Sequence, residues 1–259
     1  MEKIVVLVAS LDTKSEESSF VKDLLESQGV RVVTIDVGTG LRGRPLFVPD
    51  YSAEEVAKAA GTTVSEILAM GRGTQDDTAF MGKMSAGASA IVGQLYAEGK
   101  LDGILSLGGT AGTHMATAVM RSLPFGVPKV MVSTAASGNV RNWVGTKDIV
   151  MIPSIADIVG LNRITRNSLR KAAGAIHGMV FTDQEPLSDK PLIAVTTLGG
   201  TRRPLCDSRR DSKRRGLRLL FSMLLESAAA PWRNWCGKVR SKGSSTCRPM
   251  RSSIISTVE

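Results

Sequence analysis

The spacing of apolar residues changes twice near the start of the chain and predicts a strand, a helix and a second strand. Residues 4–9 form a continuous and largely β-branched apolar run, which is typical of a strand buried on both faces of a parallel sheet. Apolar residues then recur at helical spacing at Phe20, Val21, Leu24 and Leu25. Gly29 ends the predicted helix, and residues 30–37 are a second apolar run. This order is a β-α-β unit.

The same pattern continues along the chain and indicates an α/β fold. Further strands are predicted at residues 103–107, 129–134, 149–152 and 192–198, with helical patterns at 76–99, 115–123 and 158–179. Small residues along 76–99 permit close helix packing or contact between copies in a homo-oligomer. We therefore predict a Rossmann-like parallel sheet lobe with helices on both faces over residues 1–188. Residues 189–201 would be the first strand and Gly-Gly-Thr turn of a second lobe.

A glycine-rich turn after the strand at 103–107 is the strongest candidate site. Its residues are Gly108, Gly109, Thr110, Ala111, Gly112 and Thr113. A strand-to-helix turn leaves backbone N–H groups free at a helix N-terminus, where the helix dipole favours an anion such as phosphate. No lysine follows the glycines, so the turn is not a Walker A, and its spacing is not G-x-G-x-x-G. The alternative is a tight turn that only packs the helix on the strand.

The turn after the first strand carries the charged candidates Asp12, Thr13 and Lys14. Open α/β sheets bind ligands at the carboxyl ends of their strands, where Lys14 would neutralise phosphate and Asp12 would hold a magnesium-bound water. The alternative is a solvated salt bridge within the turn. Thr13 and Glu16 have the spacing of a capping box, which predicts that the helix begins there. Asp36, at the end of the second strand, could bind a ribose hydroxyl.

Three further segments are candidate cofactor-binding residues. Ser137 and Gly138 lie in a small-residue loop after the strand at 129–134, and Asn162 and Arg163 lie on the helix at 158–179. Gly199, Gly200 and Thr201 follow the strand at 192–198 and repeat the Gly-Gly-Thr turn of the central site. His114 and His177 have no partner carboxylate or cysteine nearby in the sequence, so we interpret both as structural.

The charge of the chain is concentrated at its end. The net charge is +9, but residues 202–259 hold 14 of the 33 lysines and arginines and only 4 of the 24 acidic residues. Residues 1–201 are therefore nearly neutral. All three cysteines also lie after residue 201, in spacings that match no zinc site. With no apolar run of spanning length and no signal peptide, we expect a cytoplasmic protein without a membrane partner.

Several motifs together resemble one family. They are Leu11–Lys14, Leu107–Thr113, Ala136–Gly138 with Val144–Asp148, and Gly160–Ile164 through Ala172–Ile176. In this order they resemble the Tm-one-like ATP-binding domain family, which includes a tomato inhibitor of tomato mosaic virus replication and many uncharacterised bacterial and fungal proteins. The resemblance covers residues 1 to about 201. It implies two Rossmann-like lobes with ATP and Mg in the cleft between them. Asn139 stands where relatives are expected to carry aspartate.

The basic tail, residues 202–259, departs from this pattern, and we interpret it as a shifted reading frame. If each codon is read from its third base, a consistent choice of third bases for residues 227–259 gives a sequence without stop codons. That sequence has amphipathic helix and strand patterns and resembles the second lobe of the family. The tail would then be disordered, and its basic charge would be a product of the shifted frame, so we do not expect nucleic acid as a partner. An RNA-binding arm with interleaved tryptophans is the alternative.

The sequence thus predicts an ATP-binding or other nucleotide-binding protein of this family. One alternative is an ATP-dependent ligase or phosphotransferase acting on a small acid, for which ATP turnover would require the second substrate. A second alternative is an RNA-binding or replication-inhibitor protein. The sequence places no nucleophile beside a base, so it leaves an enzymatic step undetermined.

Overall fold

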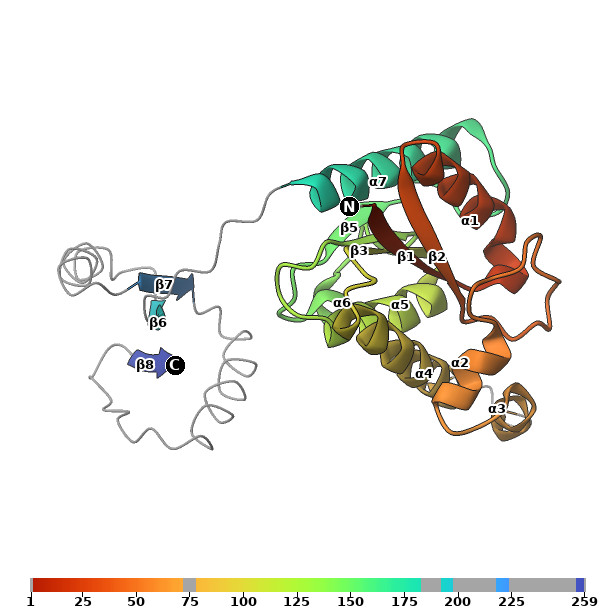
Figure 1. Cartoon of the computed structure of the whole chain (residues 1–259), viewed down its shortest axis with the longest axis horizontal. Helices are drawn as coiled ribbons and strands as arrows, with labels where there is room; N and C mark the ends of the chain where they lie inside the picture. The colour runs from red at the N-terminus through yellow and green to blue at the C-terminus, as the bar shows by residue number, and fades with distance from the viewer. Residues whose placement is uncertain (1, 72–77, 183–191, 198–217, 224–254, 259) are drawn as a thin grey trace. The chain divides into compact units, whose positions relative to one another are not determined.

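Five strands of the chain form one parallel sheet. The strands are β1 (Lys3–Ala9), β2 (Val30–Asp36), β3 (Gly103–Gly108), β4 (Lys129–Ser133) and β5 (Val150–Pro153). Their order across the sheet is β2-β1-β3-β4-β5, and every neighbouring pair is parallel. The computed structural model describes residues 2–71, 78–182, 192–197, 218–223 and 255–258 (Figure 1). All five strands lie within a residue or two of their predicted ranges.

Helices cover both faces of this sheet. They are α1 (Leu11–Glu26), α2 (Ala53–Ala59), α3 (Val64–Gly71), α4 (Thr78–Ala97), α5 (Thr110–Ser122), α6 (Arg141–Val144) and α7 (Arg163–Phe181). Side chains of α1 and α7 pack in one core cluster, and side chains of α2 to α5 pack in the other. The predicted α/β Rossmann-like lobe with helices on both faces is therefore confirmed. The long connections between parallel strands run through helices, as such sheets require.

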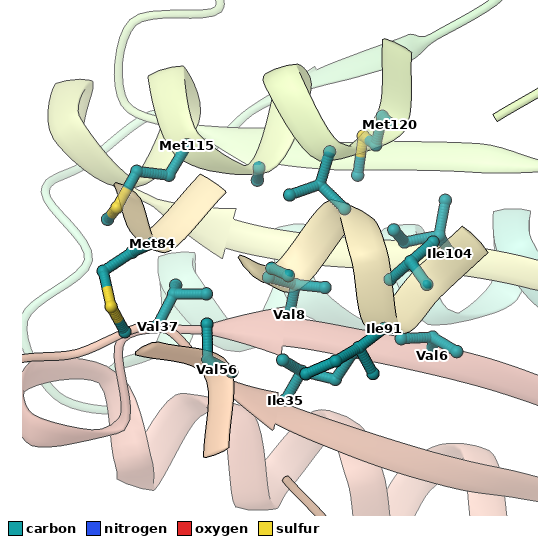
Figure 2. Packing of buried hydrophobic residues seen from close by; sticks show 14 of the residues in the cluster. Val6, Val8, Ile35, Val37, Val56, Met84, Ile91, Ile104, Met115 and Met120 are labelled. Carbon is teal, nitrogen blue, oxygen red and sulfur yellow. The ribbon is translucent and has the colours of Figure 1, made fainter. Parts of the chain in front are cut away.

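Successive residues of the central strands point to opposite faces, which gives the sheet two separate cores. Val6 and Val8 of β1 face α2 to α5, whereas Val5 and Leu7 face α1 and α7. Figure 2 shows the first core, where Val6, Val8 and Ile104 of the sheet meet side chains of α4 and α5. Because both faces are covered, β1 is apolar without a break from Ile4 to Ala9, and the other strands are largely apolar; this is the pattern that predicted them.

Glycine on α4 allows close contact with α2. A Cβ at Gly87 would lie 1.9 Å from the carbonyl oxygen of Val56, so the two helices can approach only without a side chain there. The small residues of α4 serve close packing at this position. Gly82 and Gly93 of the same helix face open space.

The chain reverses direction across the sheet after β2, and this places a crevice at the carboxyl ends of β1 and β3. From β1 the chain passes to β2 on one side, and it later returns to β3 on the other side of β1. The loops that follow β1 and β3 therefore diverge at this point. In doubly wound sheets such a switch point is where ligands bind.

A second compact unit, residues 185–259, contains three described strands. In it β6 (Leu192–Thr197) pairs in parallel with β7 (Arg218–Met223) and antiparallel with β8 (Ile255–Val258). The predicted strand at 192–198 is confirmed. The other residues of the basic tail lie outside the described residues.

Candidate functional site

A pocket of about 560 Å³ opens at the switch point of the sheet. It is lined by the turns after β1 and β3, by the loop after β2, and by side chains of α3, α4 and α5. The two turns predicted from the sequence thus meet in one site. Of the sixteen predicted cofactor-binding residues, the lining includes Asp12, Thr13, Lys14, Gly108, Gly109, Thr110, Ala111 and Gly112.

The central turn presents the uncapped N-terminus of α5 to the pocket. Gly109 is the N-cap residue in an extended conformation (φ −77°, ψ −163°), and no side chain caps this end of the helix. The N–H groups of Thr110, Ala111 and Gly112 come first in the helix, so they have no acceptor within it. A Cβ at Gly108 would lie 3.2 Å from Cα of Gly112, so the glycine lets strand and helix pack closely.

Thr113 has a structural role instead of the predicted binding role. Its side chain is buried, and its Oγ donates a hydrogen bond to the Gly109 carbonyl oxygen at 2.8 Å. The Ser133 hydroxyl lies 2.6 Å away and accepts from the Ala135 N–H at 3.0 Å. Thr113 therefore ties the turn after β3 to the turn after β4, and it does not line the pocket.

The first turn brings a second helix N-terminus to the same pocket. Helix α1 begins at Leu11 with Ser10 as its N-cap, and the Ser10 side chain makes no capping hydrogen bond. The predicted capping box starting at Thr13 is wrong: the Thr13 hydroxyl donates to the Ser10 carbonyl oxygen at 3.3 Å. The helix bends at Lys14, whose backbone is non-helical (φ −128°, ψ 27°). Thr13 and Lys14 are half-buried and line the pocket.

Asp12 is fixed by the loop that follows β2. Its Oδ2 accepts hydrogen bonds from the Thr39 N–H at 3.2 Å and from the Thr39 hydroxyl at 2.9 Å. Cβ atoms at Gly38 and Gly43 would lie 2.7 Å from Asp12 Oδ1 and 2.9 Å from the Asp12 carbonyl oxygen, respectively. The two glycines therefore let this loop close over the first turn.

Asp36 holds the first turn and the loop together, and it is not placed to bind a ribose. Its side chain is buried, and Oδ1 accepts from the Leu11 N–H at 2.9 Å and the Gly38 N–H at 2.8 Å. These bonds explain why α1 begins at Leu11. Burial raises the pKa of Asp36, and the charge of Asp12 adds to this effect, whereas the two backbone hydrogen bonds oppose it.

Replacing Asp36 by asparagine should therefore leave the fold intact and change its response to pH. Because the folded state raises the pKa of Asp36, wild-type stability includes a contribution that is present below the unfolded carboxyl pKa and is lost as pH rises through the folded pKa. The asparagine Oδ1 accepts the same two N–H groups without a charge. Denaturant unfolding from pH 4 to 7 should show Asp36→Asn gaining stability relative to wild type as pH rises. Asp36→Ala should lose about 2 kcal/mol. A constant difference between wild type and Asp36→Asn would contradict this account.

Other predicted residues lie outside the pocket. Ser137 and Gly138 are exposed on the loop after β4. Asn162 is the N-cap of α7, where its Oδ1 accepts from the Ile164 N–H at 2.8 Å and the Thr165 N–H at 3.0 Å, and Arg163 beside it is exposed. The spacing of Asn162 and Thr165 before an amphipathic helix is a capping signal that explains this role. Gly199, Gly200 and Thr201 lie outside the described residues.

Two parts of the pocket were missed by the sequence reasoning. The loop after β2 contributes Gly38, Thr39, Leu41 and Arg42, and helices α3 and α4 contribute Ile67, Leu68, Phe80 and Met81. The glycines of the loop were a usable signal, because they follow a strand that ends beside the first turn. Helices α3 and α4 gave no such signal in the sequence, because their apolar residues have the spacing of ordinary core residues.

Among the described residues that line the pocket, Lys14 and Arg42 are cationic and Asp12 is the carboxylate. Two helix N-termini, Lys14 and Arg42 favour an anion, and Asp12 lies among them. Within the described part of the chain, no three histidine, cysteine, aspartate or glutamate side chains gather as a metal site. No described helix is long and apolar enough to cross a membrane.

These features define a doubly wound α/β protein with a strand-end pocket. A family model, described as the uncharacterised protein family (UPF0261) N-terminal domain, matches residues 3–185, so the chain belongs to this family. A UPF0261 protein of Clostridium tetani is 41% identical over 202 residues, which are 78% of this chain and 48% of that protein. The chain spans about half the length of the bacterial relatives it matches.

A tomato protein is also similar to this chain. The tomato "ToMV susceptible protein tm-1(GCR26)" of Solanum lycopersicum is 30% identical over 193 residues, covering 68% of this chain and 25% of that protein. This supports the family link predicted from the motifs. Among solved structures, the Staphylococcus aureus MnaA-UDP co-structure matches with 12% identity and a TM-score of 0.32, covering 94% of this chain and 68% of that one. That likeness is too weak to bear on function.

Proposed function

We propose that the pocket at the carboxyl ends of β1 and β3 binds a nucleotide, ATP with magnesium, through its phosphates. The observation that carries this proposal is that the N-termini of α1 and α5 line one pocket and that no side chain caps the N-terminus of α5. Each helix end carries partial positive charge and N–H donors, and a polyphosphate supplies several acceptors at once. Lys14 and the Thr110 hydroxyl add donors at the same wall.

Asp12 is the residue that would hold magnesium. Magnesium in nucleotide sites usually keeps several waters and takes one or two carboxylates together with phosphate oxygens. Both bonds from Thr39 end on Oδ2 of Asp12, so Oδ1 is the oxygen that would accept from a magnesium-bound water. Bound magnesium would neutralise phosphate charge in the pocket. The buried Asp36 already accepts two backbone bonds, so we assign it no metal role.

Replacing Lys14 by methionine should weaken ATP binding about tenfold, because a hydrogen bond to a charged group is lost while the aliphatic stem is kept. The measurement is calorimetric titration of the full chain with Mg-ATP. Lys171→Met is the matched control, because Lys171 is exposed on α7 and does not line the pocket. Equal affinities for wild type and Lys14→Met would contradict the assigned role of Lys14.

The shifted reading frame after Thr201 stays a proposal. It is supported by the abrupt change in charge at that point of the sequence. Resequencing the coding region is the direct test, and an unshifted frame that encodes this same tail would refute the proposal.

A further inference from the structure

The pocket has a second wall of different chemistry, which the phosphate site does not use. Helices α3 and α4 and the body of α5 contribute only apolar residues to the described lining: Ile67, Leu68, Phe80, Met81 and Met115. Every described lining residue with a polar side chain comes instead from the loops after β1 and β2, the first turn of α1 or the first residue of α5: Ser10, Asp12, Thr13, Lys14, Thr39, Arg42 and Thr110. The pocket is therefore amphipathic.

The apolar wall is supported by the core and keeps part of its surface toward the pocket. Ile67 and Met115 are buried, whereas Leu68, Phe80 and Met81 are partly buried and pack against the core cluster around α4 and α5. Side chains held in this way lose little further conformational freedom when a ligand contacts them. A flat aromatic group of a ligand would bury apolar surface against such a wall, and it could stack on the ring of Phe80.

We infer that this wall, centred on Phe80 and Met81 of α4, receives the base of the bound nucleotide and recognises it by apolar contact alone. The inference rests on the proposed function, because the phosphates at the turns after β1 and β3 direct the rest of the ligand toward α3 and α4. Adenine and guanine differ in the amino and oxo groups on their edges. Strong discrimination between them requires polar groups that pair with those edges, and the described part of this wall offers none. On the described side chains of this wall, the site would therefore separate ATP from GTP weakly.

The test compares three ligands by calorimetry on the full chain, each with magnesium: ATP, GTP and inorganic tripolyphosphate. We expect ATP and GTP to bind within about threefold of each other and tripolyphosphate to bind at least about tenfold more weakly, because stacking of one base contributes that much. Phe80→Leu keeps an apolar side chain but removes the ring. It should weaken ATP and GTP about fivefold and leave tripolyphosphate unchanged. Phe125→Leu is the matched control, since Phe125 is 82% exposed and does not line the pocket.

Two results would overturn the inference while leaving the proposed function in place. One is ATP binding ten times more tightly than GTP, and the other is Phe80→Leu leaving ATP affinity unchanged or weakening tripolyphosphate equally. If none of the three ligands binds the folded wild-type chain, the proposed function fails, and the inference fails with it. Unfolding curves that coincide for wild type and Phe80→Leu ensure that affinity changes do not reflect a damaged fold.

Discussion

Replacing Gly109 by aspartate is expected to weaken Mg-ATP binding about 100-fold while leaving the fold intact. Gly109 has an extended backbone that any residue adopts, and a Cβ there would meet only the Thr134 hydroxyl, at 3.9 Å. Aspartate is a favourable N-cap residue, so its carboxylate would occupy the N–H groups at the start of α5 and slightly stabilise the helix. The same carboxylate would repel phosphate, and like charges in contact cost several kcal/mol.

Two further variants separate the causes of this effect. Gly109→Asn caps the helix without adding charge, so it should weaken ATP binding about tenfold. The further loss of affinity in Gly109→Asp then measures the repulsion between the aspartate carboxylate and the phosphates. Gly93→Asp adds the same charge at an exposed position of α4 that faces open space, and it should bind ATP like wild type. If Gly109→Asp binds ATP as tightly as wild type, the glycine-rich turn is a packing turn and the binding role assigned to it is wrong.

Replacing Asp148 by alanine should give the largest loss of stability, about 3 kcal/mol. Lys129 at the start of β4 is completely buried, and its ammonium donates to Pro124 O and Val127 O at 2.7 Å and to Asp148 Oδ1 at 2.8 Å. Removing Asp148 leaves a buried charge without its counter-ion. Adding Lys129→Met should restore much of the loss, because an apolar side chain of similar length needs no partner. Denaturant unfolding of the single and double variants measures both effects.

The pH dependence of this ion pair supplies an independent check. Burial opposes ionisation of Asp148, but the hydrogen bonds from Lys129 and the Gly126 N–H outweigh it, so the pKa of Asp148 lies below its ordinary value. The contribution of Asp148 is therefore present above the unfolded carboxyl pKa and is lost as pH falls through the lowered folded pKa. The stability difference between wild type and Asp148→Ala should shrink on acidification. A difference that stays constant down to about pH 2 would contradict the ion pair as its cause.

The strands and the two turns that line the pocket could be predicted because local pattern determines them. A parallel strand buried on both faces is apolar throughout, and glycines between such a strand and a helical pattern can only form a tight turn. The meeting of the turns after β1 and β3 follows from the rule that parallel strands end at the same edge. Residues Asp12, Lys14 and Gly109 were therefore within reach of the sequence alone.

The remaining site features depend on contacts between distant segments. From the sequence, Asp36 was a possible ribose ligand, but its carboxylate accepts from the Leu11 N–H, twenty-five positions earlier. This bond fixes the start of α1 at Leu11, ahead of the start predicted at Thr13. Phe80 resembled any other core residue, because periodicity reports that a helix has an apolar face and does not report what that face contacts. Asn162 could have been recognised as an N-cap by its spacing to Thr165.

An amide-resolved nuclear magnetic resonance titration of the full chain with Mg-ATP tests the central claim most directly. Our account predicts that the largest saturable shifts fall on the backbone N–H groups of Thr110 to Gly112, which have no acceptor within α5. The N–H groups of Thr13 and Lys14 donate to the Ser10 carbonyl oxygen, so they should shift less. The same titration of Gly109→Asp should leave these amides unmoved at the ATP concentration that saturates wild type. Shifts confined to other segments, or none at millimolar ATP, would contradict nucleotide binding at this pocket.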